Sequence, residues 1–216
     1  MFQDLAARLP AEIELVGIRA PARESRWAEA PFTDAATLVE SLVEQASGDF
    51  AAPFGFFGYC TGSVIAFDTA RRLRERGLPE PRLLIAVSCQ APDALRPLPG
   101  ATIDAVERLL RMGGTLGNAA LHPELLPIVR RMAEADFAIF DGYTHAPGAP
   151  VDVPISVLLG RDDPYVSSED VVGWHAHTTG EFRLHRIAGS HLLLQTSPRA
   201  VVDAVTAGVA ALSADE

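Results

Sequence analysis

The sequence predicts an α/β protein whose mostly parallel sheet is covered by helices on both faces. Short apolar runs alternate with helix-length amphipathic segments along the 216 residues, and this alternation is typical of strands joined by crossover helices. The run at 54–59, Phe-Gly-Phe-Phe-Gly-Tyr, is apolar at both alternating sets of positions, as a strand buried on both faces must be. A chain of this length buries about 70% of its unfolded surface, so we expect one domain over residues 1–216.

The N-terminal part of the chain is expected to contribute two helices and two strands. Residues 2–9 form a short amphipathic helix, and the apolar residues of 13–19 form a first strand that ends at Pro21. A helix at about 34–46 follows a Thr-Asp pair that supplies its N-cap. The next strand is 54–59, where both faces are apolar.

The remaining elements alternate in the same way to the C-terminus, with one interruption. They are a helix at 62–76, strands at 82–88, 154–159 and 182–187, and helices at 168–177 and 198–212. The segment at about 95–148 breaks the alternation, because it contains helical pieces and glycine loops but no run with the pattern of a strand. We therefore expect this segment to be a helical insertion that lies over the sheet.

The composition excludes several classes of chemistry. The chain has 18 arginines and no lysine, so neither a lysine Schiff base nor a Walker phosphate loop is available, because both need a lysine ammonium group. A net charge of −10 argues against nucleic acid, which binds to a cationic face. No apolar stretch is long enough to span a bilayer, and two cysteines without a leader peptide predict a cytoplasmic protein with free thiols.

The most informative segment is Gly58-Tyr59-Cys60-Thr61-Gly62, because it lies where a predicted strand turns into a helix. Its spacing is that of the nucleophile elbow, G-x-S-x-G, with cysteine in place of serine. The tight turn forces the nucleophile into strained backbone angles, and side chains at either glycine position are expected to collide with the neighbouring strand and helix. The alternative is an ordinary glycine-rich turn that buries a cysteine.

An elbow nucleophile needs a base and a residue that orients the base, and in this topology an acid and then a histidine follow it in the chain. Asp162 and Asp163 follow the strand at 154–159, and His191 follows the strand at 182–187. These loops leave the same edge of a parallel sheet. We prefer Asp163 as the orienting acid and expect Asp162 to cap the following turn. The other histidines are expected to be solvated or core residues, so no metal site is predicted.

Several separated motifs carry a resemblance to a known family. They are Arg19 to Arg26, the run Pro53 to Leu73 around the elbow, SCQAP from Ser88, Ala135-Asp136-Phe137 before Tyr143, GRDDPYVS from Gly160, and GSHLLL from Gly189. In this order they resemble the type II thioesterases that serve polyketide and nonribosomal peptide synthases, which have the α/β-hydrolase fold. The resemblance extends from residue 2 to the C-terminus.

The resemblance implies the activity and the role of each site residue. Type II thioesterases remove acyl groups from the phosphopantetheine arm of acyl or peptidyl carrier proteins in antibiotic biosynthesis. The resemblance makes Cys60 the nucleophile, His191 the base, Asp163 the orienting residue and 95–148 a lid over the acyl chain. The Thr61 N–H is then the oxyanion donor.

The resemblance also implies how substrate is bound. Tyr59, Met112, Phe137 and Phe140 are the candidate substrate-binding residues, although most apolar residues of the lid are needed to pack its helices. The carrier protein is the expected partner, and we expect a monomer that binds neither nucleic acid nor membrane. No cofactor is expected, because the phosphopantetheine arrives on the carrier protein.

Two departures from the family pattern leave the reaction open. The family has G-H-S-M-G where this chain has Cys60, and an acyl-cysteine is itself a thioester. It therefore suits transfer or cyclisation as well as hydrolysis. The family also opens with a further strand and a His-Ala-Gly-Gly loop that supplies a second oxyanion donor, unless the segment at 20–23 replaces it. A start codon assigned too late, a short variant with altered chemistry, and a non-catalytic carrier-binding relic are the three explanations.

Overall fold

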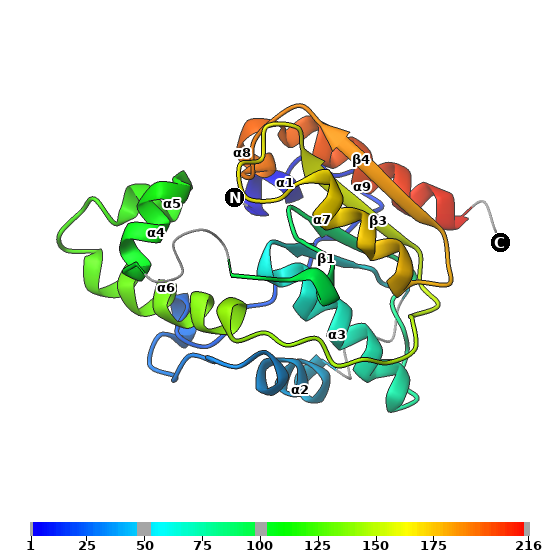
Figure 1. The fold of residues 1–216 in the computed structure, drawn as a ribbon, viewed down its shortest axis with the longest axis horizontal. Coiled ribbons are helices and arrows are strands. Elements are labelled where there is room, and N and C mark those ends of the chain that lie inside the picture. Colours follow the sequence, from blue (N-terminus) through cyan, green and yellow to red (C-terminus); the bar gives the residue numbers. More distant parts are fainter. Residues whose placement is uncertain (1, 47–52, 98–102, 214–216) are drawn as a thin grey trace.

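The computed structural model describes residues 2–46, 53–97 and 103–213. Its centre is a four-stranded parallel sheet in the order β1-β2-β3-β4 (Figure 1). The strands are β1 (Phe56–Tyr59), β2 (Leu84–Val87), β3 (Ile155–Gly160) and β4 (Phe182–Ile187). Because the strands are parallel, their carboxyl ends lie along one edge of the sheet, where the loops carrying the predicted site residues begin.

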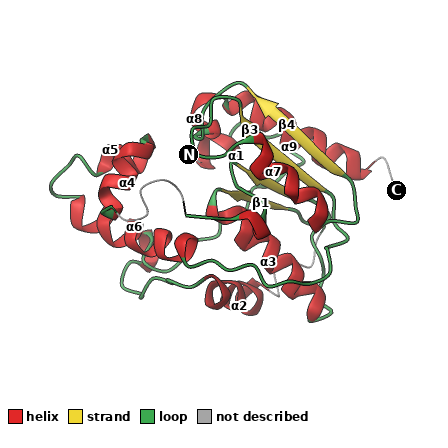
Figure 2. Cartoon of the chain, in the orientation of Figure 1, coloured by secondary structure: helices red, strands yellow, loops and turns green. Residues whose placement is uncertain are grey.

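Helices surround this sheet in the described part of the chain (Figure 2). They are α1 (Phe2–Ala6), α2 (Ala35–Ala46), α3 (Thr61–Glu75), α4 (Ala105–Met112), α5 (Gly114–Ala119), α6 (Leu126–Asp141), α7 (Ser168–Val172), α8 (Leu193–Thr196) and α9 (Pro198–Ser213), with short 3-10 turns at Glu24–Arg26, Pro92–Ala94 and Gly173–His177. None of the helices in these residues has the length and apolar character needed to cross a bilayer.

Alternating side chains divide the sheet into two apolar faces. Leu84 and Ala86 of β2 belong to one buried cluster, which includes residues of α3 and α7 and the fully buried Trp174. Ile85 and Val87 belong to the opposite cluster, which is covered by α1, α8 and α9. Strands that are apolar on both faces therefore have helices on both faces, and the predicted α/β architecture is confirmed.

Four of the five predicted strands are present, and the strand predicted at 13–19 is wrong. Those residues are irregular, and Val16 and Ile18 are 72% and 61% exposed. The described sheet ends at β1, so the segment neither extends the sheet nor pairs with β1 as predicted. A strand needs a neighbour for its backbone hydrogen bonds, and apolar alternation alone did not reveal that the neighbour is missing. Leu15 alone packs against the cluster beneath α9.

The predicted insertion at about 95–148 contains α4, α5 and α6, which extend to one side of the sheet (Figure 1). A small apolar cluster, centred on Val106, Ala120 and Val129, holds the three helices together. A buried ion pair adds to it. Arg108 is 4% exposed, binds both carboxylate oxygens of Asp141 and lies 3.8 Å from the Phe137 ring centroid. Residues 98–102, predicted as part of this insertion, lie outside the described residues.

This ion pair gives a first testable prediction. Replacing Asp141 with alanine leaves the Arg108 guanidinium buried without its counter-charge, so we expect the free energy of unfolding to fall by about 2–3 kcal/mol. Urea unfolding measures the change. Glu107→Ala is the matched control, because its pair with Arg111 is 51–62% exposed and is worth at most about 0.5 kcal/mol. Equal losses in the two variants would contradict the prediction.

Candidate active site

The segment around Cys60 forms a sharp turn between β1 and α3. Cys60 has φ 50° and ψ −124°, a strained conformation for a residue with a side chain. Its N–H donates to the Val87 carbonyl at 2.8 Å, so the turn is fixed to β2. The first peptide N–H of α3, that of Thr61, has no partner in the described part of the chain. The geometry is that of a nucleophile elbow with a free N–H beside the thiol.

The two glycines of the elbow are not equivalent. A Cβ on Gly58 would lie 2.4 Å from the Ser63 Cα and 2.5 Å from the Gly62 carbonyl oxygen, whereas a Cβ on Gly62 would meet nothing within 4 Å. The predicted collision is therefore confirmed at Gly58 and wrong at Gly62. Gly62 lies in the first turn of α3, where its Cα hydrogen points to open space.

His191 and Asp163 meet at the carboxyl edge of the sheet. His191 Nδ1 donates to Asp163 Oδ2 at 2.9 Å, and the two side chains are 3% and 0% exposed. Asp163 Oδ1 accepts from the N–H groups of Tyr165 at 2.8 Å and Val166 at 3.1 Å. Asp163 thus orients the imidazole and also holds its own turn, which is the task predicted for Asp162. Asp162 is exposed.

The two loops approach closely because β3 ends in glycine. A Cβ on Gly160 would lie 2.4 Å from the Ser190 carbonyl oxygen and 2.5 Å from that of Gly189. Gly189 itself has φ 142°, a conformation that residues with side chains rarely adopt. Both glycines are needed for the backbone before His191 to lie against the end of β3.

The environment of His191 favours its protonated form. Its Nε2 is buried and has no hydrogen-bond partner in the described residues. Burial alone lowers the pKa of His191, but the hydrogen bond to Asp163 and the interaction with Cys60 outweigh it and raise the pKa to about 9. The interaction is mutual, because an imidazolium stabilises a neighbouring thiolate. The arrangement supports proton exchange between Cys60 and His191.

The raised pKa predicts how stability depends on pH. His191 binds its proton more tightly in the folded protein (pKa about 9) than in the unfolded chain (6.5). Its contribution is therefore complete below about pH 6.5 and is lost as the pH rises through about 9, a change on the order of 3 kcal/mol. Urea unfolding of wild type and His191→Gln at about pH 6 and about pH 10 measures it. The stability difference between the two proteins should shrink at the higher pH, and a constant difference would refute the assignment.

The structure places the predicted substrate-binding residues in different surroundings. The Tyr59 hydroxyl donates to the His191 carbonyl at 2.6 Å, and the Phe137 ring lies under the Arg108 guanidinium. Phe140 is 4% exposed within α6, and Met112 is half-buried at the end of α4. Contact of these four side chains with an acyl chain stays a prediction.

The segment at 20–23, predicted as a source of a second oxyanion donor, contacts the helical insertion. Arg23 pairs with Asp136 of α6, and Ala22 is buried with φ 61°. Arg131 of α6 also donates to the carbonyls of Trp27 and Glu29. These contacts fasten the segment to α6, and they do not identify a second donor.

Two residues of the site were missed by the sequence reasoning. Ser88 is fully buried, has φ 50° and donates from its hydroxyl to the His191 carbonyl at 2.9 Å. The Tyr165 ring lies edge-on to the His191 ring, 5.3 Å between centroids, and its hydroxyl donates to the Arg111 carbonyl of α4. The only signal was their place just after β2 and β3, at the edge that carries the site.

The second cysteine has a different environment from Cys60. Cys89 is 1% exposed, and burial followed by the charge of Cys60 raises the pKa of its thiol well above the usual value. A thiol held in the neutral form is a poor nucleophile. The prediction that Cys89 is a small buried residue is confirmed.

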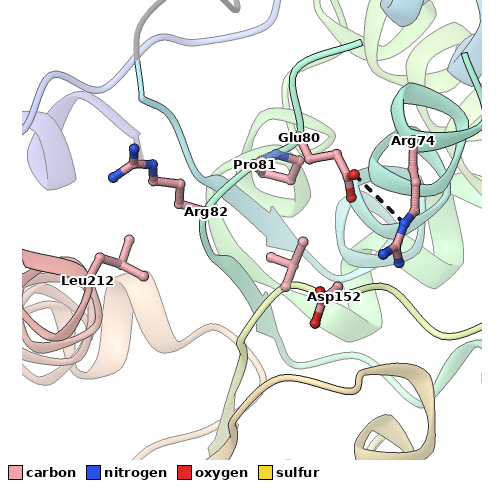
Figure 3. Close-up of a pocket in the computed structure, with 7 residues that line it drawn as sticks. Arg74, Glu80, Pro81, Arg82, Asp152 and Leu212 are labelled. Carbon is pink, nitrogen blue, oxygen red and sulfur yellow. Dashed lines mark ion pairs between the residues drawn. The ribbon is translucent and has the colours of Figure 1, made fainter. Parts of the chain in front are cut away.

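A pocket lies at the opposite edge of the sheet (Figure 3). It is lined by Arg74, Glu80, Pro81, Arg82, Asp152, Val153 and Leu212. Residues 80–82 precede β2 and residues 152–153 precede β3, so this pocket is at the amino ends of the strands. It is separate from the site that contains Cys60.

The fold and the site together define an α/β-hydrolase. The elbow follows β1, the acid follows β3 and the histidine follows β4, which is the order of nucleophile, acid and histidine in that class. More narrowly, the chain belongs to the thioesterase domain family, whose family model matches residues 1–208. The predicted resemblance to type II thioesterases and the predicted α/β-hydrolase fold are both confirmed.

Known thioesterases are similar to this chain over most of its length. It is 31% identical over 196 residues to a probable cadicidin biosynthesis thioesterase of Streptomyces griseus, covering 89% of this chain and 54% of that protein. It is 27% identical over 210 residues to the gramicidin S biosynthesis protein GrsT of Aneurinibacillus migulanus, covering 94% and 80%. The structure is similar to RedJ, a thioesterase from the prodiginine biosynthetic pathway in Streptomyces coelicolor, with a TM-score of 0.86, 25% identity, and coverage of 96% and 84%. The chain thus spans about half of the first of these relatives.

Proposed function

We propose that the chain hydrolyses acyl thioesters carried on phosphopantetheine, through an acyl-Cys60 intermediate. The observation that carries the proposal is the convergence of a strained cysteine at an elbow with a buried histidine that is oriented by a buried aspartate. The names of the similar proteins, which include thioesterases of cadicidin and prodiginine biosynthesis, support the class of substrate.

The first step transfers the acyl group to the enzyme. His191 accepts the thiol proton, and Cys60 Sγ bonds to the thioester carbonyl carbon while the Thr61 N–H donates to the oxyanion. The tetrahedral intermediate then breaks the carbon–sulfur bond to pantetheine. The departing thiolate takes the proton from His191, which leaves an acyl-cysteine and a free pantetheine thiol.

The second step releases the acid. His191 takes a proton from a water molecule as its oxygen attacks the acyl-Cys60 carbonyl, and Cys60 leaves as a thiolate that recovers the proton. Asp163 stays ionised and keeps Nδ1 protonated throughout. The steps need no cofactor beyond the pantetheine arm that the substrate brings.

A second candidate, acyl transfer or cyclisation, is favoured by the cysteine itself. An acyl-serine is an ester, but an acyl-cysteine is a thioester and is about as activated as the substrate. An amine, thiol or carbanion can therefore replace water in the second step with little loss of driving force. The two functions share the first step and differ in what consumes acyl-Cys60.

Intact mass spectrometry after exposure to an acyl pantetheine thioester tests both candidates. We expect wild type to gain one acyl group that decays to free acid, and Cys60→Ala to gain none. Cys89→Ala is the matched control and should acylate like wild type, because its thiol is buried. An adduct that persists until an amine or thiol is added indicates transfer. Absence of both adduct and turnover would refute the catalytic proposal in favour of a carrier-binding relic.

The partner proposed is an acyl or peptidyl carrier protein, since pantetheine reaches such an enzyme on that protein. We further propose a cytoplasmic monomer. Its support is limited to the two free cysteines.

A further inference from the structure

The backbone carbonyl of His191 accepts hydrogen bonds from two hydroxyl groups. The Tyr59 hydroxyl donates at 2.6 Å and the Ser88 hydroxyl at 2.9 Å. We propose that Tyr59 and Ser88 form a carbonyl clamp, defined by these two bonds, that sets the position of His191 relative to Cys60. Both are positioning residues, because they act on the histidine and not on substrate.

The clamp joins the base to the strands that carry the nucleophile. Tyr59 is the residue before Cys60, and Ser88 follows Val87, whose carbonyl accepts the Cys60 N–H at 2.8 Å. His191 comes from the loop after β4, which is separated from β1 by two strands. Without the clamp, the histidine would be located by its own loop and by Asp163. Neither of these is attached to the strand that carries the thiol.

The backbone at Ser88 supports a functional role. Its φ of 50° is unfavourable for any residue except glycine, asparagine or aspartate. The elbow explains the same angle at Cys60, but Ser88 only ends a strand, where no elbow is required. Strain of this kind persists where the surrounding structure fixes the conformation, often at active sites. Here it directs a fully buried hydroxyl at the His191 carbonyl.

The environment of Tyr59 keeps its hydroxyl a donor. Burial, and then the charge of Cys60, raises the pKa of Tyr59 above its ordinary value. The phenol therefore stays protonated while Cys60 and His191 exchange a proton. The Tyr59 ring also lies edge-on to the His191 ring, with 6.4 Å between centroids. In the type II thioesterase pattern this position is histidine, so the tyrosine clamp accompanies the cysteine nucleophile of this chain.

The test measures the reactivity of Cys60 without any thioester. The rate of Cys60 alkylation by iodoacetamide at about neutral pH reports how well His191 activates the thiol. We expect Tyr59→Phe and Ser88→Ala each to lower this rate roughly fivefold, the effect of one lost hydrogen bond. Ser88→Gly should behave like Ser88→Ala, although glycine relieves the backbone strain. His191→Gln sets the scale as the variant without a base.

Further measurements separate positioning from a general loss of stability. Tyr143→Phe removes a buried hydroxyl outside the site and should alkylate at the wild-type rate. The clamp variants should lower kcat for an acyl pantetheine thioester by a similar factor with KM unchanged. Wild-type alkylation rates in Tyr59→Phe and Ser88→Gly would overturn the clamp, as would a wild-type rate in His191→Gln. A variant that melts at the wild-type temperature yet alkylates slowly supports it.

The inference rests on the proposed role of His191 as the base for Cys60, but its test can fail separately. If wild type turns over no thioester while alkylation still depends on the clamp, the proposed function fails and the clamp stands. If turnover depends on Cys60 but alkylation and kcat ignore both hydroxyls, the function stands and the clamp fails.

Discussion

Replacing Gly58 with alanine is expected to lower the free energy of unfolding by about 3 kcal/mol or more. The added Cβ would lie 2.4 Å from the Ser63 Cα, 2.5 Å from the Gly62 carbonyl oxygen and 2.6 Å from the Ser63 nitrogen. All three are backbone atoms of the first turn of α3, so no side-chain rotation relieves the contact. β1 and α3 would have to separate, although both pack against the core of the sheet. Urea unfolding measures the loss.

Gly62→Ala is the matched control four residues later. A Cβ there meets nothing within 4 Å, and alanine favours helix over glycine by about 1 kcal/mol. We expect this variant to be as stable as wild type or slightly more stable. If both alanine variants lost the same stability, the close approach of Gly58 to α3 would not be what determines the cost.

The two glycines show what the spacing of a motif leaves undecided. The pattern G-x-C-x-G predicted the turn and the residue with unfavourable backbone angles, and both are confirmed at Cys60. It treated Gly58 and Gly62 alike, because spacing does not show where each Cα hydrogen points. That direction depends on the packing of the strand against the helix, which is a tertiary property.

The strands were predicted best where burial is most complete. The segments containing β2 and β3 are apolar on both faces, and helices cover both. The same reasoning failed at 13–19, because those residues have an apolar pattern but no neighbouring strand in the described sheet. Hydropathy reports which side chains prefer burial, whereas a strand also requires a backbone partner.

The site was predicted in part, for a related reason. Strand ends brought Cys60, His191 and one of two aspartates to the same edge, because topology alone determines that edge. The choice of Asp163 over Asp162 depended on a turn whose N–H groups are satisfied by the same carboxylate. The hydroxyl of Ser88 became visible only when the His191 carbonyl was placed.

Replacing Asp163 with asparagine is expected to lower kcat by about 10³–10⁴-fold with the fold intact. Asp163 Oδ1 accepts from the N–H groups of Tyr165 and Val166. The amide oxygen of asparagine must remain there, so its NH₂ group faces Nδ1 of His191. That nitrogen must then accept, the imidazole proton moves to Nε2, and the base can no longer take the proton of Cys60.

The same substitution removes the interaction that raises the pKa of His191, so the pKa should fall from about 9 toward or below its ordinary value. Titration of the histidine by NMR follows this change, and steady-state kinetics with an acyl pantetheine thioester follow kcat. Asp162→Asn makes the same change of charge one residue away on an exposed side chain. It should retain kcat within about twofold, because an exposed charge is largely screened by water. Equal losses of kcat in the two variants would mean that a general charge effect, and not the orientation of His191, accounts for the role of Asp163.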